Sequence, residues 1–166
     1  MNSKTISEQM YEQSVLYLNQ ANEYAQAHST CTKTATGCHI YHNGVLIGQG
    51  ANSGDENCKE MGCLRIALFG SNSKEHRATC RCRHAEINAL RSVADYNRKY
   101  LPQSIAVVTR YPCYDCATAL VNAGIKVVVY GRPFHVANAT MELFEKHGVK
   151  VLHIEDWNCD LSDTNA

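Results

Sequence analysis

The sequence predicts an α/β protein built on a mixed sheet, and three observations lead to this prediction. Short runs rich in β-branched residues alternate with segments whose apolar residues recur at helical spacing. An Asn43-Gly44 pair between two strand-like runs indicates a β-hairpin in the first third of the chain. A hairpin followed by alternating helices and strands gives antiparallel and then parallel strand neighbours, with helices packed on the sheet.

The first half of the chain is expected to hold one helix, the hairpin and a long insertion. Apolar residues at helical spacing predict a helix over residues 7–28. Strands are expected at 38–41 and 45–50, because Asn and Gly both accept the positive φ of a tight turn. Residues 51–82 are rich in Gly, Ser, Asn, Cys and charge with little periodicity, which indicates a long irregular insertion of the kind that is often functional.

Helices and strands alternate in the second half. Helical spacing returns at residues 84–97, and the next helix, 113–123, stops at Gly124. The last helix, 137–146, is expected to end before Gly148. Runs rich in Val and Ile predict strands at 104–109, 126–130 and 149–154.

Length and charge limit the class of protein. The 166 residues have the size of one ordinary domain, so we expect a single domain over 1–166 with an insertion at about 51–82. Lys plus Arg equals Asp plus Glu at 16 each, which favours a small-molecule partner over polymeric nucleic acid. The chain has neither the roughly 20-residue apolar run of a membrane span nor the features of a secretory signal. A cytoplasmic location is therefore expected.

The strongest chemical signal joins His84 to a Pro-Cys-x-x-Cys motif at residues 112–116. A catalytic zinc site takes three protein ligands, commonly imidazole and thiolate, and leaves one position for water. Cys113 and Cys116 share one face at the start of a predicted helix, where free N–H groups and the helix dipole favour thiolate. We therefore predict a zinc ion held by His84, Cys113 and Cys116.

Glu86 stands two residues after His84, close to the metal without being needed as a ligand. Zinc lowers the pKa of a bound water to about 7. A neighbouring carboxylate can take the proton of this water and pass it to a ring nitrogen and later to a leaving amine. Because His-x-Glu followed by Pro-Cys-x-x-Cys is the motif of zinc-dependent base deaminases, Glu86 is the candidate catalytic residue.

Other interpretations of these residues stay open. A Cys-x-x-Cys pair also occurs as a redox pair or as half of a structural zinc site. The chain could then be a zinc-stabilised structural module without activity. Glu86 separates the two classes, because a structural site usually has four protein ligands and needs no carboxylate beside an open metal position.

At these residues the chain resembles the cytidine deaminase superfamily, and within it the deoxycytidylate (dCMP) deaminase family. The resemblance runs from about Cys31 to about Ile154 and includes blocks at residues 48–52, 84–89 and 109–116. The Gly-Ile pair after the second zinc block and the Cys-rich insertion favour the dCMP deaminases. A tRNA adenosine deaminase, whose family shares both zinc blocks, and a guanine or cytosine deaminase are the alternatives.

The resemblance implies a three-layer α/β/α sandwich around a five-stranded sheet. It also implies conversion of dCMP to dUMP with release of ammonia, and a homo-oligomer, either a hexamer or a dimer. Asn52 is expected to contact the substrate sugar, the peptide of Ala85 the base, and Lys33 the phosphate. Where the family carries a substrate-stacking Tyr, this chain offers Phe134 and His135.

Two further groups of residues lie in and after the insertion. An irregular loop can be held by a structural zinc, and four cysteines are the candidate ligands of such a second ion: Cys58, Cys63, Cys80 and Cys82. The alternative is that they are buried or surface thiols. A basic stretch before His84 is either a solvated loop or a contact to the substrate phosphate; it consists of Lys74, Arg77, Arg81 and Arg83.

Overall fold

The chain folds around a mixed sheet, seen in a computed structural model that describes residues 5–71, 73–133 and 138–158. The strands are β1 (Gly37–His42), β2 (Val45–Ala51), β3 (Ile105–Arg110), β4 (Val127–Arg132) and β5 (Lys150–His153), in the order β2-β1-β3-β4-β5. The pairs β1–β2 and β1–β3 are antiparallel, whereas β3–β4 and β4–β5 are parallel. The predicted mixed five-stranded sheet is therefore confirmed.

The hairpin closes at the two residues that the sequence indicated. Asn43 and Gly44 have positive φ values of 47° and 79°. The strand residues on either side, His42 and Val45, are paired directly. Two consecutive residues with positive φ match the twist of the adjoining strands and set the register next to the turn, and an irregularity between Ile40 and Tyr41 shifts the register further along β1.

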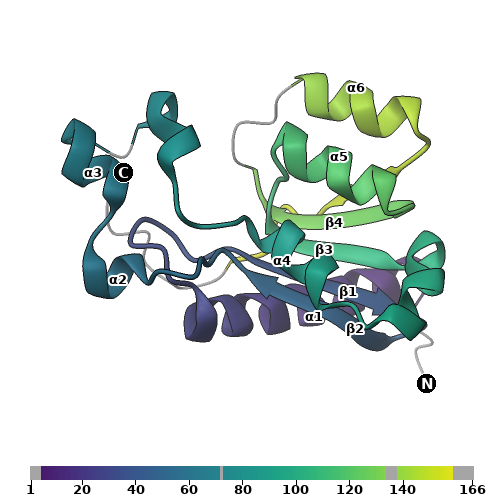
Figure 1. Cartoon of the computed structure of the whole chain (residues 1–166). Coiled ribbons are helices and arrows are strands. Elements are labelled where there is room, and N and C mark those ends of the chain that lie inside the picture. The colour runs from purple at the N-terminus through teal and green to yellow at the C-terminus, as the bar shows by residue number, and fades with distance from the viewer. Residues whose placement is uncertain (1–4, 72, 134–137, 159–166) are drawn as a thin grey trace.

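Helices cover both faces of the sheet (Figure 1). Helix α1 (Ile6–His28) lies on one face, and α4 (Ala85–Ser92), α5 (Tyr114–Asn122) and α6 (Asn138–Lys146) lie on the other. Alternate strand residues face the two sides: Val107 packs in the cluster with Leu18 of α1, whereas Val108 packs in the cluster with Leu120 of α5. This is the expected three-layer α/β/α sandwich. Within the described ranges, no helix is long and apolar enough to cross a membrane.

The insertion is less irregular than predicted. It contains two short helices, α2 (Cys58–Met61) and α3 (Leu64–Phe69), and a 3₁₀ helix η1 (Lys74–Thr79), to the left of the sheet in Figure 1. Asn57 caps α2 by accepting the N–H of Lys59 at 3.0 Å, and Gly62 and Gly70 end α2 and α3 with positive φ. Helices of four and six residues are too short to give a recognisable periodicity.

The helix predicted over residues 84–97 is too long. Helix α4 ends at Ser92, whose hydroxyl donates to the carbonyl of Ala89 and accepts the N–H of Gln49, each at 2.8 Å. Val93 then leaves the helical conformation with ψ of 119° and is buried, and a 3₁₀ helix η2 (Asp95–Gln103) follows. The contact of Ser92 with β2 is a tertiary one, which the local sequence does not reveal.

Candidate metal centre

Two helix N-termini bring the three predicted zinc ligands together. His84 is the N-cap residue of α4, and Cys113 is the N-cap residue of α5, shortly after the end of β3. Cys116 follows in the first turn of α5 and is buried. Helix α4 can lie close to β2 because Gly50 has no side chain: a Cβ there would stand 2.3 Å from the carbonyl oxygen of Ala85.

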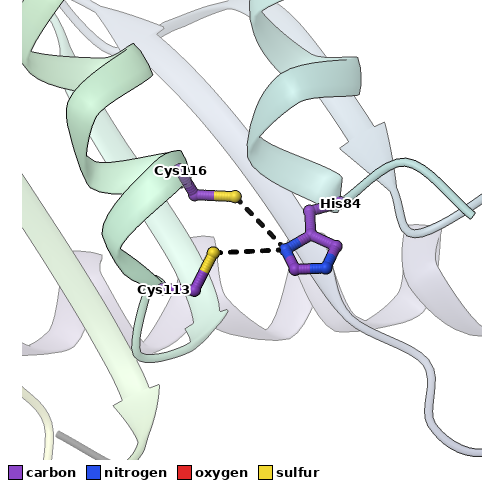
Figure 2. A group of neighbouring side chains, drawn as sticks. All are labelled: His84, Cys113 and Cys116. Carbon is purple, nitrogen blue, oxygen red and sulfur yellow. Dashed lines mark hydrogen bonds between the residues drawn. The ribbon is translucent and has the colours of Figure 1, made fainter. Parts of the chain in front are cut away.

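The three ligand atoms lie at distances that suit zinc. The Nδ1 atom of His84 is 3.4 Å from Sγ of Cys113 and 3.3 Å from Sγ of Cys116. Figure 2 shows the three side chains pointing toward one another. All three atoms lie within 4.8 Å of one another. Tetrahedral bonds of about 2.0 Å to nitrogen and 2.3 Å to sulfur would separate the two atoms by about 3.5 Å. The three side chains can therefore hold one zinc ion and leave a fourth position open.

The protonation of the two sulfurs agrees with a cation site. The hydrogen bond from Cys116, helped by His84, lowers the pKa of Cys113 to about 3, although burial acts in the opposite direction. The pKa of Cys116 is raised by that same hydrogen bond, by burial and by the charge of Glu86. The two sulfurs thus share one negative charge, and a divalent cation between them would stabilise both as thiolates.

Glu86 lies beside the ligands in the first turn of α4, and it is only 4% exposed. Burial raises the pKa of its carboxyl, while the hydrogen bond from its own backbone N–H and the charge of His84 oppose the shift. The carboxyl also shares a hydrogen bond with the thiol of Cys116. A buried carboxyl with a raised pKa can hold a proton and release it next to a reacting group.

A cavity of about 380 Å³ opens onto these residues, which is within the range of small-molecule sites. His84, Glu86 and Cys113 line it. The three residues expected to contact substrate line it as well: Lys33, Asn52 and Ala85. Phe134 and His135, the expected stacking residues, lie outside the described residues.

The side chain of Asn52 is largely occupied by the loop before β1. Its Oδ1 atom accepts the hydroxyl of Ser29 at 2.7 Å and the N–H of Thr36 at 2.8 Å. Its Nδ2 atom donates to the carbonyl of Thr34 at 2.8 Å. Asn52 therefore holds the cavity wall formed by residues 29–36, and one amide hydrogen remains for a ligand.

Asn88 is a positioning residue that the sequence reasoning missed. From α4, its Nδ2 atom donates to the carbonyl of Ala51 at 2.8 Å, and its Oδ1 atom accepts Nε of Arg83 at 3.2 Å. It therefore ties the end of β2 to the residue before His84. Asn88 lies two residues after Glu86, which could have drawn attention to it. Its partner Ala51, however, is 37 residues away, and the motif around Glu86 does not reveal that contact.

The four cysteines considered for a second zinc are only partly brought together. Sγ of Cys58 lies 3.9 Å from Sγ of Cys82, and both residues are buried. In the part of the chain that the structure describes, His84, Cys113 and Cys116 are the one group of three or more ligand residues close enough to share a metal. Cys63 and Cys80 do not join the Cys58–Cys82 pair in such a group, and the second zinc stays a prediction.

The fold and the site define a class of protein. A three-layer α/β/α sandwich with one His and two Cys ligands at two helix N-termini, and a carboxyl beside them, is typical of zinc-dependent deaminases. Residues 11–132 match the family model of the cytidine and deoxycytidylate deaminase zinc-binding region. The chain therefore belongs to the cytidine and deoxycytidylate deaminase family, and zinc is its metal.

Similar proteins include both bacterial and eukaryotic members. The chain is 34% identical to the ComE operon protein 2 of Bacillus subtilis over 146 residues, covering 81% of this chain and 71% of that protein. It is 31% identical to the deoxycytidylate deaminase of Schizosaccharomyces pombe, covering 81% of this chain but 42% of that protein. The crystal structure of the dCMP deaminase from cyanophage S-TIM5 has the same fold, with a TM-score of 0.59, 22% identity, and coverage of 86% of this chain and 97% of that chain.

Proposed function

We propose that the protein hydrolyses dCMP to dUMP and ammonia. The family membership supports deamination of a nucleotide or nucleoside. The relative from S. pombe is a deoxycytidylate deaminase, and the cyanophage enzyme was crystallised with dCMP and dUMP. In the balanced reaction, the oxygen of water replaces the amino group on C4 of cytosine, and the amino group leaves as ammonia.

Glu86 carries the protons in this proposal. Zinc bound by His84, Cys113 and Cys116 supplies a Lewis acid that makes water a nucleophile near neutral pH. The Glu86 carboxylate accepts one proton from the attacking water and passes it to N3 of the ring, and it then moves the second proton, from the hydroxyl formed on C4, to the amino group, which leaves as ammonia. The peptide of Ala85, at the start of α4, contacts the base.

The observation that carries the proposal is the buried carboxyl of Glu86 beside Cys116 on the wall of the cavity. A zinc ion that only stabilises the fold has no use for this carboxyl. We expect Glu86→Gln to lower kcat by about 10²- to 10⁴-fold, the usual contribution of acid–base catalysis, while zinc stays bound. Ammonia release and zinc content per chain measure the two effects.

A neighbouring carboxylate provides the matched control for Glu86. Asp115 stands next to Cys116 but is exposed and does not line the cavity. Asp115→Asn should therefore leave kcat within about threefold of the wild type, because the group touches no reacting atom. Full activity in Glu86→Gln would contradict the catalytic role, and an equal loss in both variants would indicate a general effect of charge.

A substrate panel tests the choice of dCMP. Ammonia release is compared for dCMP, CMP, deoxycytidine, cytosine, guanine and a tRNA containing the target adenosine. We expect dCMP to have the highest kcat/KM. Far better turnover of deoxycytidine would contradict the dCMP assignment, and turnover of guanine or tRNA alone would select one of the alternative deaminases.

We also propose that the protein is a homo-oligomer. Apolar side chains on the edge strand β2 and the adjoining helix α1 support this: Val45 is 62% exposed, Leu16 is 52% exposed and Leu46 is 41% exposed. Sedimentation equilibrium should give the mass of a dimer or a hexamer. A monomer at micromolar concentration would contradict the proposal.

A further inference from the structure

The lining of the cavity is strongly basic. Four lining residues are cationic, namely Lys33, Arg65, Arg77 and Arg110, whereas Glu86 is the single carboxylate among the described lining residues. The whole chain has no such excess, because 16 basic residues balance 16 acidic ones. The positive charge is therefore local to the cavity and favours an anionic group on the ligand.

The arginines that precede His84 divide into two kinds. Arg81 forms an ion pair with Glu56, and Arg83 pairs with Asp55 at 3.0 Å. Neither of these two arginines lines the cavity. Arg77 differs, because it lines the cavity and has no carboxylate partner among the residues that the structure describes.

Arg65, from α3, is the second cavity arginine with donors to spare. Its Nη1 atom donates to the carbonyl of Ser73 at 3.1 Å, and its guanidinium also hydrogen-bonds to the sulfur of Cys63. Its Nε atom is buried and has no acceptor in the described part of the chain. A guanidinium has five N–H donors, so other donors of Arg65 remain for an anion in the cavity that this residue lines.

Metal ligands and arginines come from different parts of the fold. The ligands stand at the N-termini of α4 and α5, whereas α3 and η1, which carry Arg65 and Arg77, lie beyond the ends of the strands (Figure 1). A nucleotide has the same polarity, with the base at one end and the phosphate at the other. A guanidinium matches a phosphate with two parallel hydrogen bonds.

We propose that Arg65 and Arg77 bind the 5′-phosphate of the substrate, so that the insertion between β2 and α4 makes the enzyme select nucleotides over nucleosides. This inference rests on the proposed deamination of a cytosine nucleotide and assigns its phosphate specificity to two residues. The base reacts at the metal centre, and the two guanidinium groups hold the charged end of the same molecule. The two residues determine specificity and take no part in the chemical step.

The test compares dCMP with deoxycytidine in Arg65→Gln, Arg77→Gln and the double variant at fixed ionic strength. Each single change should lower kcat/KM for dCMP by about 10- to 100-fold, the usual effect of losing a charged hydrogen bond. The kcat/KM for deoxycytidine should change less than threefold, because this substrate has no phosphate. Inorganic phosphate should inhibit the wild type competitively and the double variant much more weakly.

Arg81→Gln is the matched control. It removes the same charge from the same segment, but Arg81 pairs with Glu56 and does not line the cavity. The ratio of the two kcat/KM values should stay within twofold of the wild type. An equal loss of dCMP activity in Arg81→Gln would overturn the inference, since net charge alone would then explain it. So would equal losses for both substrates in the cavity variants.

Arg65→Lys and Arg77→Lys keep the inference testable if a Gln variant fails to fold. Each retains the charge but loses the planar fork, so an intermediate loss for dCMP is expected. Calorimetric binding of dCMP and of inorganic phosphate separates the two proposals. The wild type could bind both ligands, lose that binding in the arginine variants, and still release no ammonia. This result would contradict only the deaminase proposal. Active variants with an unchanged preference for dCMP would contradict only the phosphate assignment.

Discussion

The imidazole of His39 is held in one neutral form by its neighbours. Tyr41 donates its hydroxyl hydrogen to Oε1 of Gln20 at 2.7 Å, so the 3.0 Å contact with His39 requires the ring to donate from Nδ1. Nε2 is buried and has no partner among the described residues. Burial accordingly lowers the pKa of His39 to about 4, because a proton on Nε2 would have no acceptor.

His39 therefore makes the fold sensitive to acid. The unfolded chain binds this proton near pH 6.5, and the folded chain binds it only near pH 4. Since the unfolded state holds more protons between these values, stability falls as the pH drops from about 6.5 to 4. We expect this residue to contribute about 1–2 kcal/mol to the loss, allowing for partial solvent screening.

The His39→Asn variant tests this contribution. Asn retains a donor near the position of Nδ1 but does not titrate. Its free energy of unfolding, measured by urea denaturation, should depend less steeply on pH than that of the wild type between pH 6.5 and 4. Both proteins contain His84, so its effect cancels when the two free energies of unfolding are subtracted. Identical slopes of the free energy of unfolding against pH would contradict the role of His39.

Residues that carry chemistry could be predicted from the sequence, whereas residues that position them could not. His84, Cys113 and Cys116 follow from the coordination chemistry of zinc, and the structure brings their ligand atoms within 4.8 Å. The hydrogen bonds of Asn52 and Asn88 join segments that are 16 to 37 residues apart. Such partners depend on the tertiary fold and leave no mark on local spacing.

At the scale of elements, the approach of α4 to β2 sets the positions of His84 and of the Glu86 carboxyl. A Cβ at Gly50 would stand 2.3 Å from the carbonyl oxygen of Ala85 and 2.3 Å from the amide nitrogen of Ala89. Both contacts are with backbone atoms, which cannot turn aside as a side chain can. Any side chain at this position must push the helix away from the strand.

We therefore expect Gly50→Ala to damage both stability and activity. The overpacked contact should cost about 1–3 kcal/mol in the free energy of unfolding. Displacement of α4 should lower kcat by at least tenfold, because Glu86 moves with the helix. Gln49→Ala is the control, since Gln49 is exposed on the same strand. Normal kcat in Gly50→Ala would show that the helix does not need this close approach.

Long elements could be predicted better than short ones. The helix expected at residues 7–28 is observed as Ile6–His28, because about six turns give a clear apolar periodicity and Thr5 and Glu8 form a capping box. The two helices of the insertion are shorter than two turns and are set by a cap and by glycines. Composition alone therefore indicated an irregular segment there.

At the scale of the whole molecule, zinc joins α4 to α5 above a core that does not depend on it. Apolar clusters on both faces of the sheet hold the layers together. Removal of zinc by a chelator should therefore leave the far-ultraviolet circular dichroism nearly unchanged. Zinc at a free concentration of a thousand times its Kd adds about 4 kcal/mol to the free energy of unfolding. Calorimetry should therefore show a Tm about 10 °C lower for the apoprotein than for the zinc-bound protein. An apoprotein that is unfolded at 25 °C would contradict this view.

The number of zinc ions per chain decides whether the insertion holds a metal of its own. Among the described residues, His84, Cys113 and Cys116 alone bring three ligand atoms together, so this centre accounts for one zinc per chain. Cys113→Ser should lose this ion, because a hydroxyl replaces a thiolate ligand. Cys58→Ser should keep it, since the sulfur of Cys58 contacts that of Cys82 rather than the metal centre. Two zinc ions in the wild type, one of them lost in Cys58→Ser, would instead establish the second site that the cysteines of the insertion suggest.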